Sequence, residues 1–204
     1  MKTNIYIDGF NLYYGCIKDT PYHWLNVAEM CRLLLLKDKI HRIKYFTALV
    51  TPCPSDPEKP LRQRAFLRAL QTIPNLEIIL GSFLSHEVTM PRSPIGSGYV
   101  RVVKTEEKGS DVNLATHLLL DGFRNDYELA VVVSNDSDLL LPIQVVKEQF
   151  GKPVGLLNPQ RDPSVALIPH VMFVKNIRKN VLKNSQFPPV LTDGNGKFFK
   201  PEPW

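Results

Sequence analysis

The chain has 204 residues, of which 44% are hydrophobic and 22% are charged. This is enough apolar material for the core of one compact domain, and it excludes both global disorder and a large multidomain machine. The net charge of +5 at pH 7 favours a polyanionic partner such as nucleic acid. The sequence has no apolar run near the roughly 20 residues of a membrane span and no secretory signal, so we expect a soluble cytoplasmic protein.

Cysteine and histidine do not form metal-binding patterns in this sequence. The three cysteines, Cys16, Cys31 and Cys53, include no CxxC pair, which predicts reduced, mostly buried thiols and no disulfide framework. The five histidines lie on different predicted elements without i,i+4 pairing. A zinc site is therefore not expected.

The first half of the sequence alternates short β-prone runs with helical patterns. Strands are predicted at residues 4–7, 43–50 and 77–84, and helices at residues 11–18, 26–36 and 61–72. Asn26 is the predicted N-cap of the second helix, with Glu29 in the capping-box position. Four prolines between residues 51 and 60 exclude a regular element there.

The second half continues the alternation. Residues 85–98 are predicted to form a loop or a long hairpin, followed by a returning strand at residues 99–104. Further strands are predicted at residues 129–133, 153–157 and 171–174, and helices at residues 110–123 and 139–150. The run at 129–133 is the most strongly β-branched of the chain, which is typical of a central parallel strand.

Strands that alternate with helices of ten or more residues predict an α/β sandwich with a mainly parallel central sheet. From residue 185 onward, four prolines and two glycines break all periodicity, so we expect a domain at residues 1–184 and an arm or a disordered end at residues 185–204. Phe198, Phe199 and Trp204 would let such an arm bind a second copy, so a homodimer is one possibility.

Four aspartates occupy positions that the predicted fold brings to one edge of the sheet. Asp8 follows the first strand, and Asp136 and Asp138 follow the strand at 129–133. Asp111 lies in the first turn of a crossover helix, which begins at the same edge as the carboxyl ends of the parallel strands. We therefore expect these four carboxylates to meet where open α/β sheets bind ligands.

A single Asp at a strand end or helix start is most often a cap or a turn former. Four carboxylates together need a counter-charge, which a divalent cation supplies. A ligand set of oxygens without a His or Cys cluster selects Mg²⁺ or Mn²⁺. Asn11 either caps its helix or holds Asp8 or a water in place.

Charge is distributed unevenly along the chain. Residues 37–68 contain eight Lys or Arg against three acids, whereas residues 105–138 contain eight acids against Lys108 and Arg124. An acidic metal site beside a basic segment suits a phosphodiester substrate, and Arg62 and Arg64 are candidates for contacts with its backbone. Lys108 is a candidate for a contact with a phosphate oxygen, or a hinge together with Gly109. The alternative for the basic segment is an ordinary solvated surface.

Three short motifs occur in order along the chain: YIDGFNLY at residues 6–13, EKGSDV at residues 107–112 and VSNDSD at residues 133–138. Together they resemble the NYN domain family, a branch of the PIN-like nucleases, over about residues 4–175. The resemblance implies a three-layer α/β/α sandwich and Mg²⁺- or Mn²⁺-dependent cleavage of RNA. It also implies an acidic site made of Asp8, Asp111, Asp136 and Asp138, with Asn11, Ser134 and Asn135 beside it.

Two positions depart from the pattern of that family. Many relatives have Gly where this chain has Asn135, and many have another Asp where this chain has His117. Loss of that acid would weaken or alter metal binding. For His117 itself, a core position in a Leu-rich helix is the alternative to a role in the site.

Three hypotheses of function follow from these residues. The first is a metal-dependent ribonuclease that uses the four aspartates. The second is an RNA-binding protein of the same fold that does not cut, because its acid cluster is incomplete. The third, a phosphatase of the haloacid dehalogenase type, needs a second Asp two positions after the first, where this chain has Phe10. A nicotinamide or flavin enzyme would require a GxGxxG motif after a strand, and the sequence has none.

Overall fold

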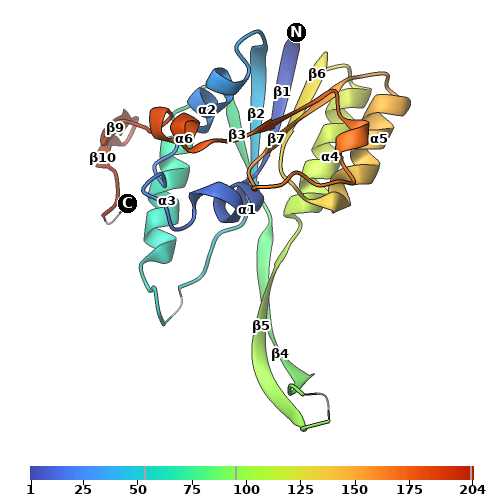
Figure 1. Ribbon diagram of the computed structural model, residues 1–204. Helices are drawn as coiled ribbons and strands as arrows, with labels where there is room; N and C mark the ends of the chain where they lie inside the picture. Colours follow the sequence, from blue (N-terminus) through green and yellow to red (C-terminus); the bar gives the residue numbers. More distant parts are fainter. Residues whose placement is uncertain (53, 95, 203) are drawn as a thin grey trace.

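A six-stranded sheet forms the centre of the structure (Figure 1), which is a computed structural model that describes residues 1–52, 54–94, 96–202 and 204. The strand order is β3-β2-β1-β6-β7-β8, and every neighbouring pair runs parallel. The strands of the sheet are β1 (Lys2–Asp8), β2 (Lys39–Thr47), β3 (Leu76–Leu80), β6 (Leu129–Val133), β7 (Val154–Asn158) and β8 (Phe173–Asn176). This is a doubly wound order, in which the winding reverses between β1 and β6.

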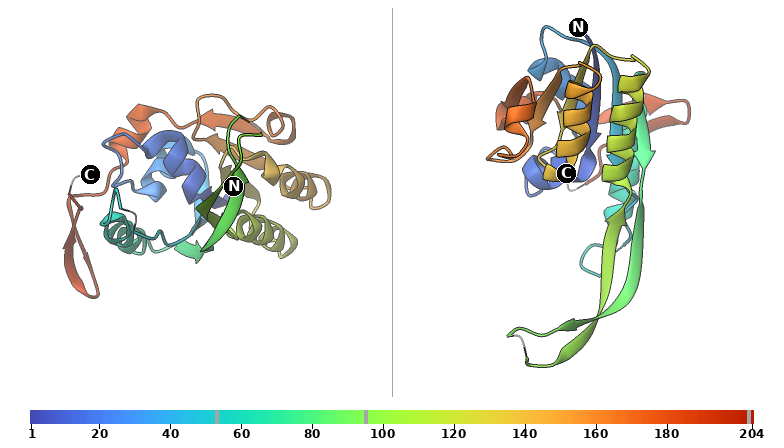
Figure 2. Two further views of the ribbon diagram at one scale, coloured as in Figure 1. Left: turned by 90° about the horizontal axis from the view of Figure 1, so that it is seen from below. Right: turned by 90° about the vertical axis from the view of Figure 1, so that its right-hand side faces the viewer.

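Helices cover both faces of the sheet and make three layers (Figure 2). One face carries the α4–α5 pair, and the other carries the remaining α-helices and a π-helical turn at Tyr13–Ile17. The helices are α1 (Gly9–Leu12), α2 (Val27–Leu34), α3 (Lys59–Leu70), α4 (Ser110–Phe123), α5 (Leu140–Glu148) and α6 (Lys179–Asn184). Short 3₁₀ turns lie at Ser137–Leu139 and Ile168–His170. The predicted three-layer α/β/α sandwich is confirmed.

The central strands are buried on both sides because their apolar side chains alternate between two cores. In β1, Ile5 and Ile7 pack with the helices that precede β3, whereas Tyr6 packs with α4 and α5. All five residues of β6 are buried, as its β-branched run predicts. Helix α2 begins as predicted, with the Asn26 side chain accepting a hydrogen bond of 3.1 Å from the backbone N–H of Glu29.

The predicted strand at residues 77–84 is two strands that meet at Gly81. Strand β3 stays in the sheet, whereas β4 (Ser82–Pro91) leaves it and pairs with β5 (Tyr99–Lys108) as an antiparallel ribbon. The ribbon projects from the body of the molecule (Figure 1). A Cβ atom at residue 81 would lie 2.5 Å from Glu107 Oε1 and 2.6 Å from the Lys108 carbonyl oxygen. The end of β5 therefore approaches this position so closely that it requires glycine.

The last twenty residues differ from the expected arm or disordered end. They contain a hairpin of β9 (Val190–Asp193) and β10 (Gly196–Phe199), and its Phe198 side chain is buried in the core. The Arg68 guanidinium binds both carboxylate oxygens of Asp193 at 2.7 and 2.8 Å and lies over the Phe198 ring. This segment therefore packs as part of the same body, which its lack of periodicity did not reveal.

The structure tests the cysteine and membrane predictions for the residues that it describes. Cys16 and Cys31 are free thiols, and burial raises the pKa of each to about 12. Cys53 lies outside the described residues. Within the described ranges, no helix has the length and apolar character needed to cross a membrane.

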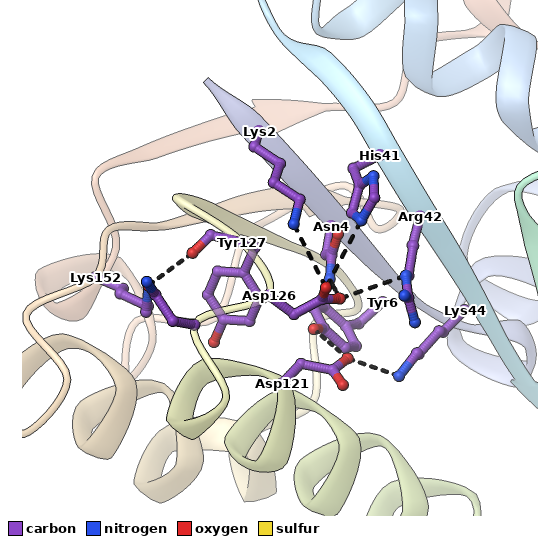
Figure 3. Close-up of polar contacts among 11 residues, drawn as sticks. Lys2, Asn4, Tyr6, His41, Arg42, Lys44, Asp121, Asp126, Tyr127 and Lys152 are labelled. Atoms are coloured by element: carbon purple, nitrogen blue, oxygen red, sulfur yellow. Dashed lines mark hydrogen bonds and ion pairs between the residues drawn. The ribbon is translucent and has the colours of Figure 1, made fainter.

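A buried ionic cluster joins the sheet to α4 (Figure 3). Lys44 of β2 donates a hydrogen bond of 2.6 Å to Asp121 Oδ2, and the Tyr6 hydroxyl donates to the same oxygen at 2.8 Å. Lys44 also lies 3.0 Å from His117 Nδ1. Both side chains of the Lys44–Asp121 pair are less than a tenth exposed, so each charge depends on the other for compensation.

We expect Asp121→Asn to destabilise the protein by about 3–5 kcal/mol, because it leaves the Lys44 ammonium buried without a counter-charge. Urea unfolding followed by circular dichroism measures the change. The control is Glu29→Gln, which removes the acid of an exposed pair with Arg32 and should cost no more than about 1 kcal/mol. Equal losses in the two variants would contradict this account of the buried cluster.

Candidate active site

Asp8 ends β1 and is the N-cap of α1. Its Oδ1 accepts a hydrogen bond of 2.9 Å from the backbone N–H of Asn11, and its Oδ2 accepts one of 3.0 Å from the Ser134 hydroxyl. The next residue, Gly9, is required by close packing, because a Cβ there would lie 2.7 Å from the Phe46 carbonyl oxygen. The motif thus places an almost fully buried carboxylate at the carboxyl end of the first strand.

The segment after β6 lies beside Asp8. Ser134 accepts a hydrogen bond of 3.1 Å from the Asp136 N–H, and the Asn135 N–H donates one of 3.0 Å to Asn11 Oδ1. Asp136 caps the 3₁₀ turn by accepting from the Asp138 N–H at 3.0 Å. The Asn11 side chain therefore joins the segment after β1 to the segment after β6, while its backbone belongs to the first turn of α1.

Asp111 is the second residue of α4, where the positive end of the helix dipole favours a carboxylate. Gly109 precedes the helix with φ of 97°, a conformation that favours glycine. Glu107 accepts hydrogen bonds from the Ser110 N–H at 3.1 Å and the Ser110 hydroxyl at 2.8 Å. The EKGSDV motif is thus a helix start that directs Asp111 toward the carboxyl edge of the sheet.

These residues line one open cleft of about 360 Å³ at the point where the winding of the sheet reverses. The cleft brings together three of the four predicted aspartates and Asn11, and its walls are Asp8, Phe10, Asn11, Tyr14, Phe83, Glu107, Ser110, Asp111, Asp136 and Gln160. Asp138 is exposed outside this lining, although its charge acts on Asp111. The expected meeting at one edge is therefore observed for Asp8, Asp111 and Asp136.

Sequence reasoning missed six residues of the cleft: Phe10, Tyr14, Phe83, Glu107, Ser110 and Gln160. Phe10 and Glu107 lie inside the quoted motifs, so their positions next to Asp8 and Asp111 were a usable signal. Tyr14 follows Phe10 by four residues, the spacing of one helix face. Phe83 and Gln160 come from the ribbon and from the loop after β7, and no motif marks them.

Two acids of the cleft, Asp8 and Asp111, have raised pKa values. Burial raises the pKa of Asp8 to about 6, the charges of Asp111 and Asp136 add to this, and the bonds from Asn11 and Ser134 oppose it. Burial also raises the pKa of Asp111, together with the charges of Asp136, Glu107 and Asp138. Among the described residues, none of the four predicted aspartates forms an ion pair with a Lys or Arg side chain.

The donor set has the chemistry of a hard cation site, since it consists of carboxylate and amide oxygens that lack a counter-charge. In the described ranges, no three Asp, Glu, His or Cys side chains are close enough to hold an ion together. Mg²⁺ commonly keeps several waters and uses one or two carboxylates. The residues therefore fit a hydrated Mg²⁺ or Mn²⁺ and do not form a closed cage.

The other predicted contact residues lie outside the lining of the cleft. Lys108 ends β5 and pairs with Glu106 at 3.3 Å. Arg64 is exposed on α3, whereas Arg62 faces a second cavity and pairs with Asp56. The Asn135 side chain is occupied with the loop that follows β7: it donates to Gln160 Oε1 at 3.1 Å and accepts from the Ser164 N–H at 2.6 Å.

His117 lies away from the acidic cleft. Its ring packs against Phe46 with centroids 5.6 Å apart, and burial together with the Lys44 charge lowers its pKa. Lys44 therefore faces residue 117, where we expect many relatives to have an Asp. His117 is half-buried, so it lies at the edge of the core and not inside it, in contact with Lys44 and Phe46.

The chain matches the model of one known protein family. The NYN domain model matches residues 2–168, which is most of the sequence. The chain belongs to the NYN domain family. NYN domains are generally nucleases, so the fold is nuclease-like.

Two proteins similar to this NYN chain have contrasting descriptions. It is 27% identical to 6-hydroxy-3-succinoylpyridine 3-monooxygenase of Pseudomonas putida, over 100% of this chain and 75% of that protein. A crystal structure of a protein of unknown function from Vibrio parahaemolyticus superposes with a TM-score of 0.58 at 19% identity, covering 88% of this chain and 94% of the other. The second likeness supports the fold alone.

The pKa of Asp8 predicts a specific pH dependence of stability in EDTA. An acid with a higher pKa in the folded chain than in the unfolded chain destabilises the fold as it ionises. The unfolding free energy should therefore fall as the pH rises from about 4 to about 6 and then level off. Asp8→Asn should remove about 2–3 kcal/mol of that fall, because one pKa unit corresponds to about 1.4 kcal/mol.

Urea unfolding at pH 4, 5, 6 and 7 measures this difference. The two proteins should have similar stability near pH 4, and the Asn variant should be the more stable one at pH 7. Parallel pH profiles for the two proteins would contradict the high pKa of Asp8.

Proposed function

We propose that this protein is a metal-dependent ribonuclease that hydrolyses RNA phosphodiester bonds. The observation that carries the proposal is the meeting of Asp8, Asp111 and Asp136 in one open cleft at the switch point of the sheet. Carboxylates with raised pKa values in a cleft are typical of catalytic sites. Membership of a family of generally nuclease domains supports the reaction class.

One or two of Asp8, Asp111 and Asp136 would bind a hydrated Mg²⁺ or Mn²⁺ directly, and the remaining acids, Asp138 included, would act on it through its waters and their charge. A bound ion supplies positive charge for the phosphate oxygens and lowers the pKa of water. This reaction needs no nucleophile from the protein, so we expect products with a 5′-phosphate and a 3′-hydroxyl.

The chain's own contribution is to orient Asp8. Two donors, the Asn11 N–H and the Ser134 hydroxyl, bind one carboxylate oxygen each and so fix the plane of the group. Each oxygen keeps a second lone pair, and the carboxyl lies on the wall of the cleft. Ser134 and Asn11 are thus positioning residues, and the side of the cleft formed by the half-buried Phe10 and the exposed Tyr14 is available to RNA.

Contacts with the RNA backbone are proposed for Arg62, Arg64 and Lys108. Arg64 is exposed and forms no ion pair with any described residue, whereas Lys108 would have to exchange its bond with Glu106 for a phosphate. Ionic contacts of this kind make affinity fall with salt concentration. The charge of the basic segment is smaller than its composition suggests, because Lys44 and Arg42 bind Asp121 and Asp126.

A second candidate function is RNA binding without cleavage. It is favoured by the absence, within the described residues, of three acids close enough to bind one ion directly. This candidate predicts RNA affinity that survives the loss of Asp8 and Asp136 and no cleavage with either metal. The haloacid dehalogenase alternative is disfavoured, because Phe10 stands where that chemistry needs its second Asp.

A third candidate comes from the Pseudomonas putida relative, which is described as a monooxygenase of a substituted pyridine. Its match over the whole of this chain favours testing the same reaction here. The acidic cleft has no evident part in such a reaction, so we rank it below hydrolysis. Consumption of 6-hydroxy-3-succinoylpyridine with O₂ and a reduced nicotinamide is the assay.

We expect wild-type protein to degrade single-stranded RNA in Mn²⁺ or Mg²⁺ and to be inactive in EDTA. Asp8→Asn and Asp136→Asn should each lower the rate at least about 100-fold, as loss of a central electrostatic group does. Asp138→Asn should have a smaller effect, because Asp138 lies outside the lining of the cleft. Gel electrophoresis of end-labelled RNA gives the rates and the product ends.

The matched control is Glu148→Gln, which removes an exposed acid at the end of α5 and should cleave like wild type. Equal cleavage by wild type and Asp136→Asn would refute the proposal, because a contaminating nuclease would explain both rates. Salt-sensitive RNA binding without cleavage in any metal would favour the second candidate.

A further inference from the structure

A second cavity adjoins the acidic cleft along the same edge of the sheet. It lies beside the carboxyl ends of β1 and β2, under α3, and it shares Phe10 and Tyr14 with the cleft. Its other walls include Tyr13, His23, Phe66 and Trp204. The two hollows are therefore neighbours separated by two aromatic side chains.

The size of this cavity fits one six-membered ring. Its volume is about 120 Å³, somewhat below the cavity of about 150 Å³ that accepts benzene in an engineered protein. The mouth is partly open to solvent, so a ring that enters it can stay attached to a longer chain. A single six-membered ring such as a pyrimidine therefore suits this volume better than the fused rings of a purine.

The aromatic side chains that line the cavity contact one another. The His23 and Trp204 rings are stacked at 5.4 Å with 21° between their planes, and Phe66 meets Trp204 edge-on at 6.2 Å. Burial and the nearby charges of Lys200 and Arg62 lower the pKa of His23, so its ring is neutral at pH 7. Stacking on such rings is how proteins hold the bases of single-stranded nucleic acids.

Polar groups around the cavity are available to a heterocycle. The hydroxyls of Tyr13, Tyr45 and Thr47 border it, and none of them has a hydrogen-bond partner among residues 1–52, 54–94, 96–202 and 204. Lys59 and Arg62 supply positive charge at the rim, with Arg62 also bound to Asp56. A planar ring with hydrogen-bonding edges and an attached anion satisfies both sets of groups.

We propose that this cavity binds one pyrimidine base of the RNA substrate, so that the attached phosphates extend past Tyr14 toward the acidic cleft on one side and toward Arg62 on the other. This assignment rests on the proposed ribonuclease function for the identity of the ligand. It gives the enzyme a preference for single-stranded RNA, because a paired base cannot enter the cavity. It also gives a preference for uridine or cytidine at one position beside the cut.

Binding of small probes tests the cavity without catalysis. Isothermal titration calorimetry in EDTA is performed with uridine 5′-monophosphate, with ribose 5-phosphate, which has the anion and no base, and with nicotinate, a pyridine ring with a carboxylate. Uridine 5′-monophosphate should bind at least about ten-fold more tightly than ribose 5-phosphate, the usual contribution of one stacked base. Trp204→Ala should remove that difference, whereas Phe199→Ala, which alters an exposed aromatic of the same segment, should not.

Equal binding of the two sugar phosphates would overturn the proposal, as would tight binding of nicotinate without binding of the nucleotide. Asp8→Asn should bind uridine 5′-monophosphate like wild type, so failure of cleavage and failure of the base site are separate results. In cleavage, Trp204→Ala should slow the cutting of oligouridylate about ten-fold and change little on an oligomer with abasic sites. Equal slowing on both substrates would refute a base-specific role.

Discussion

The parallel pairing of β1 with β6 is the constraint on which the candidate site depends. Their register places Ile7 opposite Val133, so the residues that follow, Asp8 and Ser134, end up adjacent and hydrogen-bonded. A second bond, from the Asn135 N–H to Asn11 Oδ1, joins the two loops one step further out. A shift of one residue would turn the buried side chains of both strands to the opposite faces, so the two cores fix the geometry of the acids.

Acids at the two edges of the sheet differ in whether a cationic side chain neutralises them. Toward the amino edge, Asp126 binds Lys2 and Arg42 and accepts from Asn4, and Asp121 is neutralised by Lys44. At the carboxyl edge, the described residues place no cation against Asp8 or Asp111, whose pKa values are raised. Since the chain has basic residues elsewhere, this contrast is a property of the site, and a positive charge bound in the cleft would relieve the repulsion between these acids.

Much of the fold was predictable from local pattern, and the exceptions have physical causes. Helix α4 and strand β6 have the predicted bounds, because one has a clear helical period and the other is buried on both faces. The strand at 77–84 was wrongly joined because apolar alternation continues through Gly81, whereas only the close approach of β5 shows that the chain leaves the sheet. The hairpin at the end is stabilised by Arg68, a contact across 125 residues that no local pattern encodes. For the site, the three motifs predicted the aspartates of the cleft, whereas Phe83 and Gln160 come from segments that lie outside those motifs.

The short helical segment after β1 links the acidic cleft to the aromatic cavity. Its first turn is α-helical, and it then widens into a π-helical turn in which the Lys18 N–H binds the Tyr13 carbonyl at 2.8 Å. The rings of Tyr13 and Tyr14 meet edge-on, with their centroids 5.2 Å apart. Tyr14 lines both the acidic cleft and the aromatic cavity, whereas Tyr13 lines only the cavity. Gly15 allows this turn to approach Pro159, since a Cβ there would lie 3.0 Å from the proline side chain. Because π-turns are rare and occur frequently at functional sites, the turn here is best explained by the placement of these two tyrosines. The segment at residues 8–17 thus carries both an acid of the cleft and the two tyrosines that line the cavity.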